Sequence, residues 1–361
     1  MLWTHLDRLF KFFRQPFAIF WLYYLIGPIV ALIKVYEISS IQGLFKEEDM
    51  FEKLAVHIIG YLSLFPIIFY CAKLKLSSTQ SIIRIKPKAI IIIPGIILFF
   101  TFLYLTYTAF DFANSNFFLP DKIRAEIYRD WIYESKVMPL ILISLILCAT
   151  FFGPITYLIV GIPSVIIDIF MGRRHLLLIF IYPLVSRLRM KGLLITVLFI
   201  GILTSMRHGI DHIATSFTVL KNTIFSESYM IFLSSTNHSN CLINIGSNNS
   251  LVHFERYTQY CRIMDYAAGG FTARFHYNIM FGMASACIYS FFFWLILKIF
   301  YRHISPVLRE VLGVIIFTAL FITYRDDMGN SLMFLFQYVL LLSVASIILK
   351  MLITKKGALH R

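Results

Sequence analysis

Six arginines lie within the one long polar segment of the chain, residues 207–275, or at the ends of hydrophobic runs. A guanidinium group keeps its charge at physiological pH and binds phosphate through two parallel hydrogen bonds. A single arginine at a helix end is more often a membrane anchor, but a group of them on one membrane face suits a lipid-linked diphosphate. The six candidate diphosphate ligands are Arg173, Arg174, Arg207, Arg256, Arg274 and Arg325.

A histidine stands two residues after one of these arginines. His276 follows Arg274 at the junction between the polar segment and the next hydrophobic run. Activation of a hydroxyl nucleophile needs a general base within about 3 Å and with a pKa near 7, and histidine is suited to that role. His276 is the first candidate, and Asp211 with His212 is the second. The alternative is that His276 only caps a helix or forms a hydrogen bond at the membrane interface.

The sequence predicts no metal and no cofactor. It has no CxxC motif and no His/Cys spacing typical of zinc. The adjacent acids Asp326 and Asp327 follow Arg325 directly and are expected to pair with it. Fixed arginines can neutralise a leaving group by preorganised electrostatics without a metal ion.

The elements that must position these residues are membrane helices. Of the 361 residues, 59% are hydrophobic and 14% are charged, and the mean hydropathy is +0.77. A bilayer core needs about 20 apolar residues per helix, and backbone groups in lipid must be satisfied within the segment. A β-barrel would show short alternating segments, whereas the run from Ala89 to Phe110 is uncharged and almost unbroken.

The net charge of +14 is explained by its distribution. The two termini and the turns at 73–88, 187–191 and 298–310 hold 18 basic and 2 acidic side chains, and the remaining segments hold 15 basic and 17 acidic. An excess of Lys and Arg marks the cytoplasmic side of a membrane protein. We therefore expect no nucleic-acid partner, and we expect residues 207–275 to lie on the outer side.

The apolar runs predict a single integral membrane domain, residues 1–361, with about ten helices and both termini inside. Residues 1–15 form an amphipathic cytoplasmic arm, and residues 207–275 form the large outer loop. The 31 uncharged residues of Val137–Ile167 are divided at Gly153-Pro154; one tilted helix is the alternative, and it would invert residues 172–206. The predicted helices are Pro16–Ile33, Leu54–Ala72, Ala89–Phe110, two within Val137–Ile167, Leu176–Ser186, Gly192–Met206, Tyr277–Leu297, Val311–Tyr324 and Ser331–Leu349.

Two of the five cysteines lie in the large loop. Cys241 and Cys261 would face an oxidising compartment, where a disulfide is permitted. A bridge between them would close a 21-residue segment, and two unpaired thiols are the alternative.

The order of these features resembles that of the bacterial O-antigen and capsule repeat-unit polymerases, known as Wzy, and more distantly the O-antigen ligases. The similarity lies in Gly172-Arg173-Arg174 opening a helix, in the basic turn 187–191, in His276-Tyr-Asn278 followed by Gly282, and in the turn 324–330. Two departures are the doubling of Arg173 by Arg174 and Asp326 in place of a small residue.

The resemblance implies an activity, partners and a location. It implies a metal-independent glycosyltransferase with a GT-C-like helical bundle in the bacterial inner membrane, its site facing the periplasm. The enzyme would transfer a growing glycan from undecaprenyl diphosphate to the next lipid-linked oligosaccharide repeat unit. A chain-length regulator protein is a possible further partner.

Three other functions compete with this expectation. A ligase would use the same donor with lipid A core as acceptor, and a membrane acyltransferase would modify the sugars. A transporter or flippase of lipid-linked sugars would favour internal repeats and charges at mid-membrane, and the sequence has no evident repeat and few such charges.

Overall fold

The structure is a computed structural model of the 361-residue chain, and it describes residues 12–13, 15–35, 47–76, 191, 231–232, 235–236, 270–305, 308–325 and 328–358. This part of the chain is helical apart from short turns, as the sequence predicts. Its elements are α2 (Pro16–Val35), α3 (Glu47–Ser63), α4 (Phe65–Lys73), η3 (Gly270–Thr272), α14 (Ala273–Tyr277), α15 (Ile279–Tyr301), α16 (Arg309–Arg325) and α17 (Met328–Ala358). The helices predicted between residues 89 and 206 lie outside the described residues.

Three helical segments are long and apolar enough to cross a membrane. They are Phe51–Lys73, which joins α3 to α4, Ile279–Tyr301 and Met328–Ile347, with mean hydropathies of 1.9, 1.9 and 1.7. Pro16–Ile29 and Val311–Tyr324 are shorter apolar helical segments. These five segments correspond to five of the ten predicted helices.

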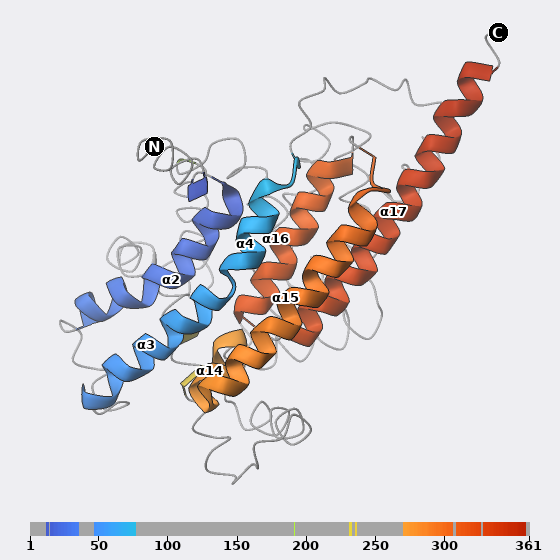
Figure 1. Cartoon of the computed structure of the whole chain (residues 1–361). Helices are drawn as coiled ribbons and strands as arrows, with labels where there is room; N and C mark the ends of the chain where they lie inside the picture. Colours follow the sequence, from blue (N-terminus) through green and yellow to red (C-terminus); the bar gives the residue numbers. More distant parts are fainter. Residues whose placement is uncertain are drawn as a thin grey trace, which may run out of the picture.

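Helices α2 and α16 run in the direction opposite to that of α3, α4, α15 and α17, so that the helix ends collect at two ends of a bundle (Figure 1). One end holds the start of α2, the last residues of α4 and α15 and the start of α16. There the hydroxyl of Tyr301 donates a hydrogen bond to the carbonyl of Lys75 at 3.4 Å, and Arg309 lies over the Tyr301 ring at 5.1 Å. We call this the basic end, because Lys73, Lys75, Lys298, Arg302 and Arg309 belong to it.

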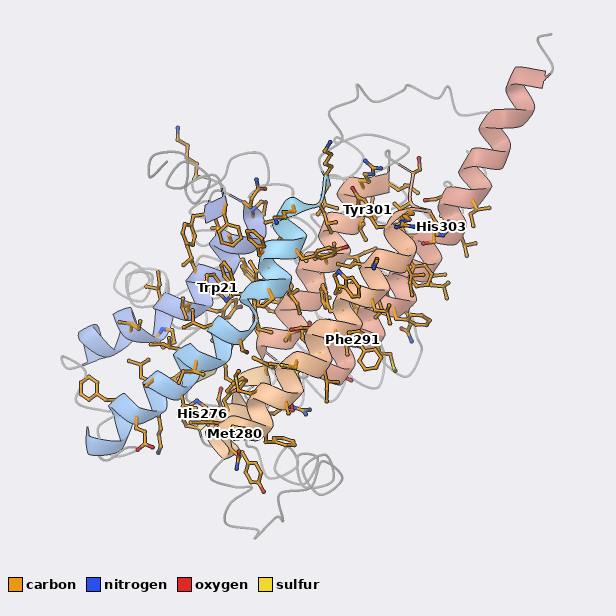
Figure 2. The ribbon with its side chains drawn as sticks, in the orientation of Figure 1. Trp21, His276, Met280, Phe291, Tyr301 and His303 are labelled. Carbon is orange, nitrogen blue, oxygen red and sulfur yellow. The ribbon has the colours of Figure 1, made fainter. Side chains whose placement is uncertain are left out.

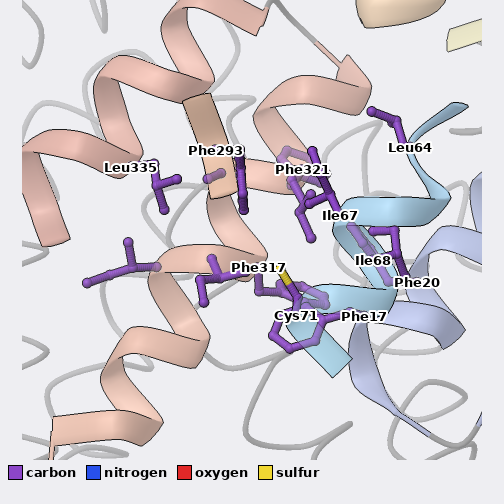
Figure 3. Close-up of a cluster of buried hydrophobic side chains, with 14 of the residues drawn as sticks. Phe17, Phe20, Leu64, Ile67, Ile68, Cys71, Phe293, Phe317, Phe321 and Leu335 are labelled. Atoms are coloured by element: carbon purple, nitrogen blue, oxygen red, sulfur yellow. The ribbon is translucent and has the colours of Figure 1, made fainter. Parts of the chain in front are cut away.

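Helix α16 is the centre of the bundle. All of its side chains from Val311 to Tyr324 are buried, as expected for a helix that is apolar around its whole circumference. Helix α17 packs along it, and α2 covers it through Phe20, whose ring centroid lies 4.4 Å from that of Phe317 (Figure 3).

Helix α15 has one packed face and one face that meets no other described helix. Its buried residues recur at helical spacing, and the large apolar side chains on the other side stay exposed. An extensive exposed apolar surface is typical of a membrane-facing helix. Figure 2 labels Met280 and Phe291, which belong to this face. The exposed large apolar residues of α15 are Ile279, Met280, Met283, Ile288, Phe291, Phe292 and Ile299.

The predicted helix Leu54–Ala72 is divided in the structure, because α3 ends at Ser63 and α4 begins at Phe65. Pro66 has no N–H and its ring clashes with the preceding turn, so a regular helix cannot continue through it. Beside this break, the Tyr61 carbonyl accepts hydrogen bonds from the Leu64 N–H at 3.2 Å and from the Trp21 indole N–H at 2.8 Å.

Candidate functional site

The candidate site lies at the end of the bundle opposite the basic end, where α14 leads into α15. Figure 2 shows His276 there and Tyr301 with His303 at the other end. The sequence predicts one helix from Tyr277, but the structure has a separate five-residue helix, α14, and starts α15 at Ile279. The reason is Asn278, whose backbone is extended and whose Oδ1 accepts a hydrogen bond from the Phe281 N–H at 3.1 Å, as an N-cap residue does.

A phenylalanine and two glycines hold α14 in place. Phe275 is buried between α3 and α15. A Cβ atom on Gly282 would lie 2.5 Å from Phe275 Cγ, and a Cβ on Gly60 would lie 3.0 Å from Cγ2 of Thr272 and 3.3 Å from the Phe275 ring. The close approach therefore requires glycine at 282. Part of the sequence pattern from His276 to Gly282 thus has a structural purpose, which is to cap α15 and to seat α14.

Arg274 is enclosed by this arrangement. Its side chain is only 6% exposed, and its guanidinium carbon lies 6.0 Å from the centroid of the Phe281 ring. A membrane anchor keeps its charged group in water at the surface. The burial of Arg274 favours an internal role over that of a surface anchor.

His276 has an unusual environment for a general base. Its side chain is half-buried, and its Nε2 atom is buried with no hydrogen-bond partner among the described residues. Burial, and then the positive charge of Lys53, lower the pKa of His276 to about 3. The imidazole is therefore neutral at pH 7, but it is a weaker base than the sequence predicts.

A second histidine, which was not among the residues predicted from the sequence, lies in this place. His57 of α3 is fully buried, and its ring centroid lies 6.0 Å from that of His276, with 31° between the ring planes. Neither of its ring nitrogens has a hydrogen-bond partner among the described residues. The signal was available in the sequence, because an ionisable side chain within an apolar span marks a functional candidate.

Four residues from the middle of the predicted outer loop pack beside His57, His276 and Thr272. Ile231, Phe232, Ser235 and Thr236 are helical and buried. The Phe232 ring centroid lies 5.2 Å from that of His57 and 6.1 Å from that of His276. The Ser235 hydroxyl lies within hydrogen-bond distance, 2.8 Å, of the Thr272 hydroxyl. These four residues of the segment 207–275 are therefore packed into the protein.

Two of the predicted site residues, Arg274 and His276, lie on the same short helix, α14, but at a spacing of two residues their side chains leave the helix on different sides. The backbone of a third, Arg325, ends α16 at the same end of the bundle. Within the described ranges there is no group of three or more His, Cys, Asp or Glu side chains that could hold a metal ion. Outside the described residues lie Arg173, Arg174, Arg207, Asp211, His212 and Arg256, together with Cys241 and Cys261.

Comparison of the chain with known protein families, with curated proteins and with solved structures finds no match.

Proposed function

We propose that this protein is a membrane glycosyltransferase that polymerises oligosaccharide repeat units. It transfers a growing glycan from undecaprenyl diphosphate to a hydroxyl of the next lipid-linked repeat unit, at the periplasmic face of a bacterial inner membrane. The reaction type comes from the resemblance to the repeat-unit polymerases.

The observation that carries the proposal is that one short helix, α14, holds a buried arginine, Arg274, and a half-buried histidine, His276, at the end of the bundle away from the basic end. A permanent cation lies two residues from a neutral imidazole, on a short helix fixed by the packing of Phe275. A glycan transfer from a diphosphate needs this combination, which is a fixed positive charge for the leaving group and a base for the attacking hydroxyl.

In the proposed step, the acceptor oxygen forms a bond to the anomeric carbon of the donor sugar, and the bond from that carbon to the diphosphate oxygen breaks. The hydroxyl proton passes to His276, and the electron pair of the broken bond leaves with undecaprenyl diphosphate. Arg274 stabilises the negative charge of the leaving group, and Arg325 contributes from the end of α16. A bound diphosphate also favours the charged imidazolium and so raises the pKa of His276, which makes the base stronger when the donor is present.

The test is complementation of a strain from which the gene has been deleted. Glycan length on the cell surface is compared for the unchanged protein and for Arg274→Ala, Arg274→Lys and His276→Ala, at equal membrane expression. We expect Arg274→Ala and His276→Ala to leave single repeat units, with a loss of about 10²–10³ in rate. Arg274→Lys restores transfer only in part, because an ammonium group lacks the bidentate fork.

The control is Met280→Ala, since Met280 is 78% exposed on the outer face of α15. This variant is expected to give full-length chains. Bare lipid A core in the deletion strain would assign the ligase reaction instead. An unaltered glycan pattern in that strain would exclude both glycosyl transfers.

A further inference from the structure

A row of side chains with buried polar atoms leads from the candidate site into the bundle. Its members are His276 on α14, His57 and Tyr61 on α3, and Tyr324 on α16. The ring centroids are 6.0 Å apart for His276 and His57, 4.7 Å for His57 and Tyr61, and 5.4 Å for Tyr61 and Tyr324. The three steps are short enough to make a continuous row of rings.

The polar atoms of this row have no hydrogen-bond partners within the described part of the chain. They are both ring nitrogens of His57, Nε2 of His276 and the hydroxyl groups of Tyr61 and Tyr324. Buried polar groups are almost always paired with protein or ordered water, so each exception needs an explanation. Five such atoms along one row point to a bound group between them.

The chemistry of that group follows from the two imidazoles. The two rings form no direct hydrogen bond with each other, because neither nitrogen of His57 has a partner among the residues that the structure describes. One small polar group between the rings would satisfy both of them. A neutral imidazole offers one N–H donor and one nitrogen acceptor, and His276 is neutral. A hydroxyl group meets both requirements, because it donates one hydrogen bond and accepts others.

We propose that His57 and His276 together bind a hydroxyl group, supplied either by a water molecule or by the acceptor sugar. Where the hydroxyl is that of the sugar, His57 is a positioning residue that orients the group from which His276 takes the proton. Tyr61 lies next in the row. The sugar as source rests on the function proposed above, whereas the water does not.

A packing role for His57 is a poor explanation of the same observations. An aromatic ring without nitrogen would fill the space between Phe232 and Tyr61 and would leave no buried polar atom unpaired. Histidine within a membrane-spanning segment is rare and is usually retained for function. Phenylalanine at position 57 therefore separates the two explanations, because it keeps the ring and removes both nitrogens.

The first experiment measures ¹⁵N chemical shifts of the histidine rings in the purified full-length protein, with signals assigned from His57→Gln and His276→Gln. Hydrogen-bonded shifts at both rings that do not change when an undecaprenyl-diphosphate-linked repeat unit is added identify water as the ligand. A change at both rings identifies the sugar hydroxyl. Shifts typical of free imidazole nitrogens, with and without the repeat unit, would overturn the proposal.

The second experiment compares transfer by His57→Phe and His57→Gln, since glutamine offers a donor and an acceptor. We expect His57→Phe to lower kcat by about 10²-fold, at the lower end of what general base catalysis contributes, with little change in the KM for donor. His57→Gln is expected to recover part of this loss. Full activity of His57→Phe together with an inactive His276→Ala would refute the role of His57 but would leave the proposed function unaffected. Absence of transfer by the unchanged protein would refute the proposed function only. The hydroxyl site is tested separately by the ¹⁵N shifts.

Discussion

Two buried polar clusters lie in this bundle, and they differ in how their hydrogen bonds are satisfied. Between α15, α16 and α17, the Tyr289 hydroxyl lies 2.5 Å from that of Thr323, which donates to the Ser331 hydroxyl at 2.8 Å. Ser331 in turn donates to the carbonyl of Ala319 at 2.7 Å. Every hydroxyl of this cluster has a partner. In the row from His276 to Tyr324, five buried polar atoms have none among the described residues.

This difference in hydrogen bonding indicates which cluster stabilises the fold and which one is kept for binding. A buried hydrogen bond contributes about 0.5–1.5 kcal/mol net, whereas an unpaired buried polar group costs about 1–3 kcal/mol. The Tyr289 cluster therefore stabilises the contact of three helices. The His57 row costs stability unless something binds there, and that cost is expected at a site kept for a ligand.

The largest loss of stability is expected when the packing of Phe275 against Gly282 is disturbed and the Tyr289 cluster is left unchanged. In Gly282→Val the new side chain meets the Phe275 ring, and overpacking of this kind costs about 1–3 kcal/mol or more. We expect a lower thermal midpoint in detergent and loss of glycan polymer. Ala284→Val is the matched control, because Ala284 is exposed on the same helix. Equal midpoints for the two variants would show that Gly282 does not hold the site.

Removing one member of the satisfied cluster should cost less. Ser331→Ala removes one donor to the Ala319 carbonyl and one acceptor from Thr323, but the Thr323 hydroxyl also lies 3.0 Å from that carbonyl and can donate to it. We therefore expect a loss of about 0.5–1.5 kcal/mol in the free energy of unfolding. The neighbouring exposed residue gives the control, Asn330→Ala, which is expected to have little effect. Chemical denaturation of both variants measures the difference. A Ser331→Ala protein as stable as the parent would mean that the cluster is not structural.

A decrease in pH is expected to lower the stability of the protein through His276, in the row from His276 to Tyr324. The pKa of His276 is about 3 in the folded protein and ordinarily 6.5. Between these values the unfolded chain binds the proton and the folded protein does not, so stability falls as pH decreases through this window. The contribution is at most about 1.4 kcal/mol per pH unit. We expect His276→Gln to flatten the dependence of the thermal midpoint between pH 6.5 and 4, and an unchanged slope would argue against the buried environment of Nε2.

The smallest change in stability is expected for His57→Phe. The substitution removes two unpaired buried nitrogens and keeps an aromatic ring, so the midpoint should stay the same or rise slightly. The expected change in the thermal midpoint is therefore opposite in sign to that for Ser331→Ala, and the comparison of the two variants is the test. A marked drop in the midpoint for His57→Phe would assign His57 to packing.

The sequence was most informative where one physical rule dominated. Hydrophobic length predicted five of the helical segments, and the excess of basic residues identified the groups that meet at the basic end. Helix boundaries were less accurate where a single residue decides them: Pro66 divides one predicted helix, and Asn278 moves the start of another to Ile279. These effects depend on local backbone geometry, which hydropathy does not contain.

The candidate site was only partly predictable. His276 and Arg274 stood out because they are polar residues beside a hydrophobic run. The contribution of His57 depends on contact between residues 219 positions apart in the chain, and no local pattern indicates such a contact. The burial of Phe232 likewise arises from tertiary packing of an apolar stretch inside a polar segment.

The most direct test of the central claim is the glycan ladder produced by His276→Ala, next to the Met280→Ala control, in the deletion strain at equal membrane expression. The proposed function predicts single repeat units from His276→Ala and full-length chains from Met280→Ala. Full-length chains from both proteins would contradict the assignment of the site to the α14 end of the bundle.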